Sequence, residues 1–361
     1  MAIRLAYLLG VAYTLLWAPG VGGSGHLLLR TFERWDARWF VRIAEHGYAT
    51  KQSAAFLPVY PLLVRGVAFV VRNDVAAGVL VSVAAAAASA ALLLRIGRRY
   101  LPEEGAQTTV LLLALYPAAF VFTAAYSDSL FLLFVLAAFD FAERGRAVPA
   151  GVAAALAVDT RLLGLALLPT LLLVLRSRGL LQSAAVVVLP AAALGLWLLY
   201  LHAHYGDALA TSHAEHRYWQ REPFDPHWIW HEFRNIPGSL SLVVRHLPRG
   251  AYPHSVATAA ADLYDFAFFA FGAVFTWVAW RRLGAALGLY SALTLAIVAL
   301  TPTTWRPFIS APRFLLADFP IFLALAAVLA PRPRARDAVL AGFAALGAVL
   351  AVAFARGVLV V

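Results

Sequence analysis

The residues best suited to chemistry lie in a short amphipathic segment, WDARWFVRIAEHGY at 35–48. Wound as a helix at about 100° per residue, the segment has an apolar face made of Trp35, Trp39, Phe40 and Ile43. The opposite face is charged and holds Arg38, Arg42, Glu45 and His46. Such a helix lies flat at a membrane interface, and Asp36 falls in the middle of its apolar face. A carboxylate on an apolar face is energetically unfavourable unless it takes part in binding or catalysis. The alternative is that Asp36 is the N-cap or first-turn acid of the helix.

A carboxylate beside arginines at the lipid boundary suits group transfer from a lipid-linked phosphate. The carboxylate takes the proton of the acceptor hydroxyl, while guanidinium groups hold the leaving phosphate, which is too weakly basic to need a general acid. This chemistry is an inverting glycosyl transfer through an oxocarbenium-like transition state. We therefore predict that Asp36 is the catalytic base. The candidate ligands of the donor phosphate are Arg38, Arg42, Arg161 and Arg313.

Five polar clusters stand beside apolar segments, at 126–129, 159–161, 204–207, 303–306 and 312–314. Ionisable groups at membrane depth are functional candidates, and five clusters on one side predict a cavity that opens outward. The second-rank candidates for the site are Trp35, Trp39, Tyr48, Tyr126, Asp128 and Asp207. A plain structural ion pair between Asp128 and Arg161 is the alternative.

Two histidine pairs have a spacing that would place their side chains on one helical face. They are His213-x-x-His216 with Glu215 between them, and His227-x-x-x-His231 followed by Glu232. Neither pair has a defined third ligand, and a lipid monophosphate offers little for a metal to bridge. We therefore expect no metal and no other cofactor. The sequence has no Walker A, GxSxG or HExxH motif.

The composition is that of a membrane protein. Of 361 residues, 62% are hydrophobic and 13% are charged, and the mean hydropathy is +0.77, which leaves too little polar surface to cover a soluble globule. The absence of cysteine excludes disulfides and thiolate chemistry. The net charge of +10 is dispersed among apolar segments without a nucleic-acid motif, so we expect the lipid bilayer and lipid phosphates as partners and no nucleic acid.

Short arginine-bearing turns mark the cytoplasmic side under the positive-inside rule, at 95–99, 144–146, 176–178, 281–282 and 332–336. They predict an all-α polytopic protein of one domain, 1–361, with about ten or eleven transmembrane helices. The spans are expected at 5–22 (a retained first helix), 75–95, 107–124, 127–142, 182–203, 256–280, 284–300, 313–330 and 338–356, with a short hairpin at 148–175. The apolar segment 56–72 is predicted to be re-entrant or to lie on the surface. Two loops, 23–74 and 204–255, then face outward.

Motifs along nearly the whole chain resemble the PIG-V-type mannosyltransferases, the bacterial relatives of the second GPI mannosyltransferase. They are WDxxW with a following GY at 35–48, FLPVYPLLVR at 56–65, YSDS at 126–129, TRxxG at 160–164 and PRF at 312–314. The resemblance implies a GT-C bundle, a polyprenyl-phosphate-mannose donor used on the outer face, and an acidic residue in the first loop, here Asp36, as the catalytic residue. Two positions depart from the family pattern: Asp128 stands where Glu is usual, and Phe314 where Tyr is frequent. The acceptor, a lipid or a glycan, does not carry over, since bacteria generally lack GPI anchors.

The resemblance and the arginine-dominated composition together indicate an enzyme of the bacterial plasma membrane with its active site on the outer face. The main rival is a transporter or flippase for a lipid-linked sugar, which would share an outward cavity with a basic lining. Transporters often carry inverted repeats with matched broken helices, and the 148–175 hairpin has no second copy in the other half of the chain. A catalytically inactive membrane subunit is a third alternative, against which the intact Asp36 motif argues.

Overall fold

The computed structural model describes residues 31–358, apart from 180–182, 223–225, 247–253 and 305. Four helices within these residues are apolar and long enough to cross a membrane: α5 (Asp74–Tyr100), α11 (Ala185–Tyr205), α14 (His254–Leu283) and α18 (Pro333–Ala355). The predicted first span at 5–22 lies outside the described residues. The chain is therefore an all-α polytopic membrane protein, and the predicted spans at 75–95, 182–203, 256–280 and 338–356 each coincide with one of these helices.

Two further spans are bent. The predicted span at 107–124 is α6 (Glu103–Leu115) followed by η2 (Pro117–Thr123), with 76° between them. The span at 313–330 is α16 (Ala311–Phe314) and η6 (Leu315–Ala317), followed after an 84° bend by α17 (Phe319–Leu329). Each bend has a proline at the start of the next segment, where the missing N–H and the restricted preceding residue interrupt a helix. Among the described residues the candidate spans thus number four, or six with both bent pairs.

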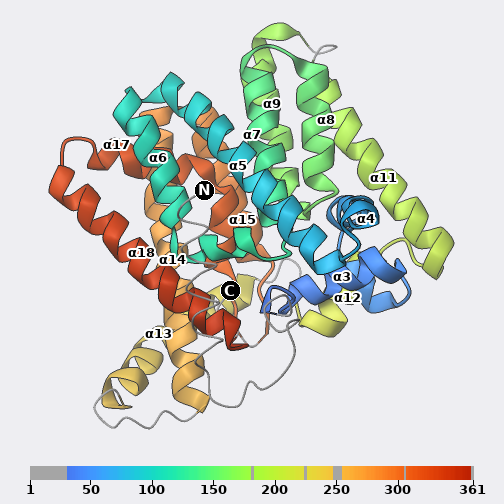
Figure 1. The fold of residues 1–361 in the computed structure, drawn as a ribbon. Helices are drawn as coiled ribbons and strands as arrows, with labels where there is room; N and C mark the ends of the chain where they lie inside the picture. Colours follow the sequence, from blue (N-terminus) through green and yellow to red (C-terminus); the bar gives the residue numbers. More distant parts are fainter. Residues whose placement is uncertain (1–30, 180–182, 223–225, 247–253, 305, 359–361) are drawn as a thin grey trace.

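Shorter helices fill the rest of the bundle (Figure 1). They are α7 (Asp128–Glu143), α8 (Ala147–Val158), η3 (Leu162–Ala166), α9 (Leu167–Leu175) and α15 (Ala285–Leu300). Helix α13 (Pro226–His246), with 21 residues, packs against α14. The hairpin predicted at 148–175 is formed by α8 and α9, and at its tip Thr160 is buried while Asp159 and Arg161 are half-buried. With 12 and 9 residues, these two helices are too short to cross about 30 Å of hydrocarbon, as predicted.

The segment predicted to be re-entrant or superficial forms α4 (Val59–Val71), which has only 13 residues and a length of about 20 Å. One side of α4 is buried through Tyr60 and Val64, while Phe69 and Val70 are more than 70% exposed. The Tyr60 hydroxyl donates to Gly78 O at 3.0 Å and lies 2.9 Å from Ser82 Oγ, which fixes α4 to α5. A helix this short, with an apolar exposed side, fits the predicted surface or re-entrant segment and does not make a full crossing.

The five arginine-bearing turns gather at one end of the bundle. Asp140 at the end of α7 pairs with Arg95, Arg99 and Arg144, which joins the first two turns. Ion pairing of Arg336 with Glu104 adds the turn before α18. Gly145 packs against Arg178, and Arg282 donates to Ala327 O at 3.5 Å, which adds the remaining two.

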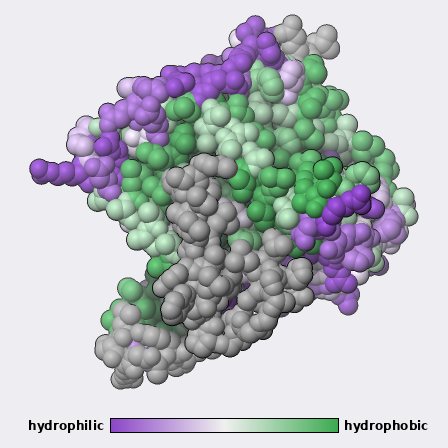
Figure 2. All heavy atoms as spheres, viewed as in Figure 1, coloured by the Kyte–Doolittle hydropathy of each residue, from purple (hydrophilic) through white to green (hydrophobic). Residues whose placement is uncertain are grey.

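On the face shown in Figure 2, this hydrophilic edge is separated by a hydrophobic zone from a second hydrophilic patch at the opposite end. The second patch lies where Figure 1 places α3 (Asp36–His46) and α12 (Ala210–Trp219). Both of these helices are short and polar compared with the spans. The bundle therefore presents its arginine turns at one end and the segment predicted to do chemistry at the other.

Candidate active site

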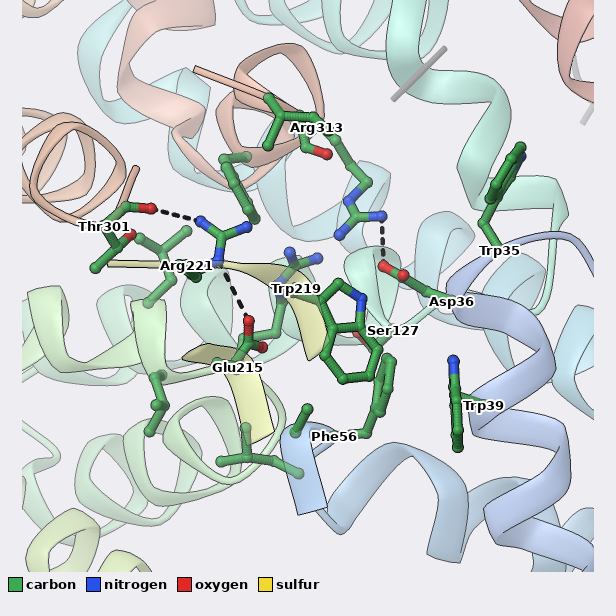
Figure 3. Close-up of a pocket in the computed structure, with 18 of the residues that line it drawn as sticks. Trp35, Asp36, Trp39, Phe56, Ser127, Glu215, Trp219, Arg221, Thr301 and Arg313 are labelled. Carbon is green, nitrogen blue, oxygen red and sulfur yellow. Dashed lines mark hydrogen bonds and ion pairs between the residues drawn. The ribbon is translucent and has the colours of Figure 1, made fainter. Parts of the chain in front are cut away.

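A cavity of about 620 Å³ opens beside α3 and α12 (Figure 3). Its wall is built from segments far apart in sequence: α3, the residues after η1 (Lys51–Ala55), the hairpin tip, α12, the end of α15 and α16. Four of the five polar clusters predicted to form a cavity contribute to it, through Ser127, Thr160, Arg161, Thr303 and Arg313. The fifth, at 204–207, does not line it. The lining holds five arginines (Arg34, Arg38, Arg161, Arg221 and Arg313) and two carboxylates (Asp36 and Glu215), so the cavity attracts anions.

Asp36 is the first residue of α3, and its carboxylate points into the cavity. The helix begins here because Trp35 has a left-handed backbone, with φ of 54°, that a helix cannot continue. The buried stripe of α3 is Ala37, Phe40, Val41, Ile43 and Ala44. The prediction that Asp36 sits in the middle of the apolar face together with Trp35 is therefore wrong. The buried stripe of α3 packs into the protein. Trp35, which precedes the helix, is 39% exposed, and Asp36 occupies the first turn of the helix, which was the alternative interpretation of this residue.

Asp36 begins a chain of four alternating charges. Its Oδ2 accepts a hydrogen bond from Arg313 Nη1 at 2.6 Å, and Arg313 Nε lies 3.6 Å from Asp128 Oδ1. The same Asp128 oxygen accepts from Arg161. The side chains of Asp128, Arg313 and Arg161 are only 4%, 10% and 14% exposed, whereas that of Asp36 is 25% exposed. The ion pair between Asp128 and Arg161, the structural alternative for these two residues, is present, and it is joined to the predicted base through Arg313.

Local structure explains how these side chains meet. Asp128 is the first residue of α7, where the helix dipole favours a carboxylate. Arg161 follows the end of α8 in an extended conformation, with φ of −154°, which turns the chain out of the helix at the hairpin tip. Arg313 lies in the single turn of α16. This turn begins after Ser310, because the Ser310 backbone, with φ of 67°, cannot belong to a helix. Each charge is thus carried by a helix terminus or a break in the membrane-embedded part.

A second ion pair lies across the cavity. Arg221 Nε is 3.3 Å from Glu215 Oε2, and Arg221 Nη1 donates to Thr301 O at 2.7 Å. Arg221 and Thr303 also form an isolated β-bridge, which ties the end of α12 to the loop after α15. Enclosure by protein raises the pKa of the Glu215 carboxyl above its ordinary value, and the nearby Arg221 guanidinium opposes that shift.

One aromatic ring lies among three guanidinium groups. The centroid of the Phe314 ring is 5.0 Å from Arg161 Cζ and 5.7 Å from the Cζ atoms of both Arg221 and Arg313. Each of these arginines has its own carboxylate partner, namely Asp128, Glu215 and Asp36. Three guanidinium groups held this close repel one another unless anions compensate them. The three carboxylates supply that compensation, so a further anion would bind here in competition with one of them.

Aromatic side chains line the opposite wall. The rings of Trp39, Phe56 and Trp219 contact one another in pairs, with centroids 5.9 Å apart for Trp39–Phe56 and Trp39–Trp219 and 5.4 Å apart for Phe56–Trp219. Phe56 is buried, and the two tryptophans are half-buried. In Figure 3 the three rings lie below the Asp36–Arg313 pair, with Glu215 beside Trp219. We refer to Trp39, Phe56 and Trp219 as the aromatic cluster.

The other predicted residues are spread more widely. Arg38 lines the cavity and donates to Glu33 O at 3.2 Å, whereas Arg42 is exposed, does not line the cavity and lies over the Trp39 ring. The Tyr126 ring stacks beneath Arg313 at 5.3 Å, and its hydroxyl donates to Arg34 O at 3.2 Å. Tyr48 is buried outside the cavity, and its hydroxyl donates to Phe56 O at 2.8 Å.

Asp207 also lies outside the cavity, where its Oδ2 is 2.7 Å from His213 Nδ1. His216 Nδ1 is 3.4 Å from Glu222 Oε1, so both histidines of the first candidate metal pair contact carboxylates on the surface. The second pair, His227 and His231, has ring centroids 4.8 Å apart. Within the described ranges, no three His, Cys, Asp or Glu side chains gather in a way that would hold a metal.

Sequence reasoning missed the wall that faces Asp36. Arg221, Trp219 and Thr301 were not predicted, and Glu215 was considered only as a metal ligand. The run of Glu215, Tyr218, Trp219 and Arg221 on one outer segment was the available signal, because charged and aromatic residues alternate there as they do around Asp36. Its partner Thr301 is 80 positions away along the chain, so no local pattern connects the two.

Comparison with known proteins agrees with the motifs. Residues 24–183 match the family model described as Mannosyltransferase (PIG-V). The GPI alpha-1,6-mannosyltransferase 2 of Rattus norvegicus is 34% identical over 152 residues, or 38% of this chain and 30% of the relative. The protein of the same name from Mus musculus is 34% identical over 174 residues, or 44% and 34%. The chain thus covers no more than about a third of these relatives, and no solved structure matches it significantly.

These matches confirm the resemblance to PIG-V-type mannosyltransferases. The family match includes the positions of Asp36, Asp128 and Arg161. Glu215, Arg221 and Arg313 lie beyond it, in the half of the chain where only the structure connects them to the first three.

Proposed function

We propose that this chain, similar over its first half to the PIG-V mannosyltransferases, is an inverting GT-C glycosyltransferase. It transfers mannose from a polyprenyl-phosphate donor to a lipid or glycan acceptor at the outer face of the membrane. The observation that carries the proposal is the pairing of Asp36 with Arg313 on the wall of a basic cavity, with Arg161 joined to them through Asp128. A base and two phosphate-binding guanidinium groups are thus held together by three separate parts of the chain.

The reaction follows from this arrangement. The acceptor hydroxyl donates its proton to Asp36 as its oxygen attacks C1 of the mannose. The bond between C1 and the phosphate oxygen breaks on the opposite face of the sugar, and its electron pair leaves with the polyprenyl phosphate. Arg161 and Arg313 stabilise the charge that develops on this phosphate, because bidentate guanidinium contacts remain strong where water is scarce. The configuration at C1 is inverted.

Arg313 has a further part in this scheme. In the structure it is shared between Asp36 and Asp128, at 2.6 and 3.6 Å. A donor phosphate that binds Arg313 competes with Asp36 for the guanidinium. Weakening of this ion pair frees the Asp36 carboxylate to accept a hydrogen bond from the acceptor hydroxyl. Donor binding therefore prepares the base for the acceptor hydroxyl.

The proposed location follows from the charge distribution. The five arginine-bearing turns lie at one end of the bundle, and the positive-inside rule assigns that end to the cytoplasm. The cavity lies toward the opposite end, beside α3 and α12, and therefore faces outward. The arginine-rich, cysteine-free composition favours the plasma membrane of a bacterium.

A transfer assay with the purified full-length protein in lipid vesicles tests the proposal. Polyprenyl-phosphate-[³H]mannose is supplied with a membrane extract or a synthetic mannoside as the acceptor. We expect label to pass to the acceptor and the new bond to be the inverted anomer. Movement of intact donor between the two leaflets without any transfer would instead establish the transporter.

A further inference from the structure

Following from the proposed function, we infer that the aromatic cluster and the Glu215–Arg221 pair form the binding site for an acceptor that is itself a sugar. The ring of this acceptor lies against Trp39 and Trp219, and its hydroxyl groups bond to Glu215 and Arg221. Neither the motifs nor the family match assigns a role to Glu215, Trp219 or Arg221, which lie outside the matched residues 24–183. The inference names the acceptor class that the proposed function leaves open.

The chemistry of this wall suits a sugar ring. A pyranose has an apolar face of C–H groups and an edge of hydroxyl groups. The electron-rich faces of aromatic rings attract such C–H groups, and a few fixed polar groups then orient the ligand. The aromatic cluster supplies the first element through two half-buried tryptophans that border the cavity. Glu215 and Arg221 supply the second, with side chains that are 33% and 22% exposed.

The position relative to Asp36 selects the acceptor over the donor sugar. Trp39 lies one helical turn after Asp36 on α3, so a ring against Trp39 is next to the proposed base. Figure 3 shows Arg313 on one side of Asp36 and the aromatic cluster on the other. An inverting displacement places the attacking hydroxyl and the leaving phosphate on opposite faces of C1. The phosphate therefore belongs with Arg313 and Arg161, and the attacking sugar with the aromatic cluster.

The prenyl chain of the donor is the competing occupant of an aromatic surface. Its hydrocarbon would cover Glu215 and Arg221 and remove them from water, and burial of charges against hydrocarbon is unfavourable. A sugar instead replaces water at both groups with its hydroxyls. The polar pair beside Trp219 thus favours a sugar at this wall.

The wall is rigid enough to be selective. Thr211 Oγ1 donates to Ala54 O at 2.7 Å, and Trp197 Nε1 donates to Thr211 Oγ1 at 3.0 Å, which fixes α12 to η1. At the other end of α12, Glu222 N donates to Pro302 O at 2.8 Å and Thr304 N to Gln220 O at 3.1 Å. Trp219 and Glu215 are therefore held at both ends of the helix that carries them.

Binding of simple sugars tests the inference without any donor. Saturation-transfer NMR is measured on the full-length protein in nanodiscs with methyl α-mannoside, α-glucoside and α-glucosaminide. We expect at least one of them to show saturation of its ring C–H protons, and Trp219→Ala to raise its Kd at least about tenfold. Tyr218→Ala is the matched control, because Tyr218 is an exposed ring on the same helix outside the cavity. No binding of any of the three glycosides to the unaltered protein, or equal binding to Trp219→Ala, would overturn the inference.

Kinetics separate this inference from the proposed function. With octyl α-mannoside as the acceptor, Trp219→Ala and Glu215→Gln should raise the acceptor KM about tenfold at an unchanged donor KM. Glu222→Gln removes a carboxylate outside the cavity and serves as the control. A changed donor KM would assign the wall to the donor and overturn the inference. Absence of any mannose transfer by the unaltered protein would refute the proposed function, whereas the NMR measurement would still decide whether a sugar binds here.

Discussion

Arg313 Nη1 donates a hydrogen bond to Asp36 Oδ2 at 2.6 Å, although the two residues are 277 positions apart in the chain. The bond joins the first described helix to the broken segment before α17. Both motifs were recognised separately in the sequence, the first as a source of the base and the second as a source of a phosphate ligand. Their contact brings together the carboxylate and one of the guanidinium groups on which the proposed reaction depends.

Replacement of Asp36 by Asn tests its role as the base. The amide keeps the size of the side chain and still accepts a hydrogen bond from Arg313, so the fold and donor binding should persist. Turnover should fall at least about 10²-fold, because the acceptor hydroxyl loses its proton acceptor. The measurement is kcat for mannose transfer. Asp207→Asn is the control, since Asp207 lies on the surface beside His213, and turnover of Asp36→Asn equal to that of the unaltered protein would remove Asp36 from the mechanism.

Much of the fold could be predicted because hydrophobic runs and arginine placement are local features. The helices α5, α11, α14 and α18 coincide with predicted spans. The tip of the short hairpin lies at Arg161, as expected. The bends after Tyr116 and Ala317 were not predicted, because proline does not reveal by how much a segment turns. The face of α3 was also misjudged. Periodicity identifies an apolar stripe, but it does not determine whether lipid or protein covers the stripe.

The site divides in the same way. Asp36, Arg161 and Arg313 stand in motifs and could be identified, whereas Arg42 shares the motif of Asp36 and yet points away from the cavity. Glu215 and Arg221 could not be placed, because their neighbour Thr301 is brought to them only by tertiary packing. Site residues that are brought together only by contacts between distant segments cannot be identified without the structure.

The close packing of α8 on α11 predicts that Gly151 does not tolerate a larger residue. A Cβ atom at Gly151 would lie 2.4 Å from the carbonyl oxygen of Ala185, and this backbone atom cannot move aside easily. We expect Gly151→Ala to lower the stability by about 1–3 kcal/mol, the usual range for overpacking, seen as a lower Tm in detergent. Gly195→Ala on α11 is the matched control, with no heavy atom within 4 Å of the new Cβ. Equal Tm values for the two variants would contradict this packing.

The raised pKa of Glu215 predicts how stability depends on pH. Burial disfavours the charged carboxylate, so the folded protein holds this proton above the ordinary pKa of 4.5. The stabilising contribution is complete below 4.5 and is lost as the pH rises through the folded-state pKa. Glu215→Gln removes this titration, so its Tm relative to the unaltered protein should increase with pH. Thermal unfolding at several pH values measures the difference, with Glu222→Gln as the control, and a difference that stays constant would argue against a raised pKa.

The proposed orientation can be tested by labelling because the chain has no cysteine. His213→Cys places a thiol at a side chain that is 65% exposed near the cavity, and Arg98→Cys places one at a 53% exposed side chain in an arginine-bearing turn. In intact cells, a membrane-impermeant maleimide should label position 213 only. Position 98 should react only after the cells are opened. The reverse pattern would place the cavity on the cytoplasmic side.

The pair of Arg161 and Asp128 tests whether a buried guanidinium serves the fold or the donor. Arg161→Ala leaves the buried Asp128, whose side chain is 4% exposed, with only the longer 3.6 Å contact to Arg313, and its Oδ2 already has no hydrogen-bond partner. Removal of one partner of a buried pair costs about 3–5 kcal/mol, so the Tm should fall clearly. The double replacement Arg161→Leu with Asp128→Leu removes both charges and should recover most of that loss, because neither charge remains buried without the other.

Mannose transfer by the recovered double variant then decides whether Arg161 serves the fold or the donor. We expect a donor KM that stays at least about tenfold higher than in the unaltered protein, since a lost phosphate contact is not replaced by packing. Full transfer activity with an unaltered donor KM would assign Arg161 to the fold alone and leave Arg313 as the principal phosphate ligand.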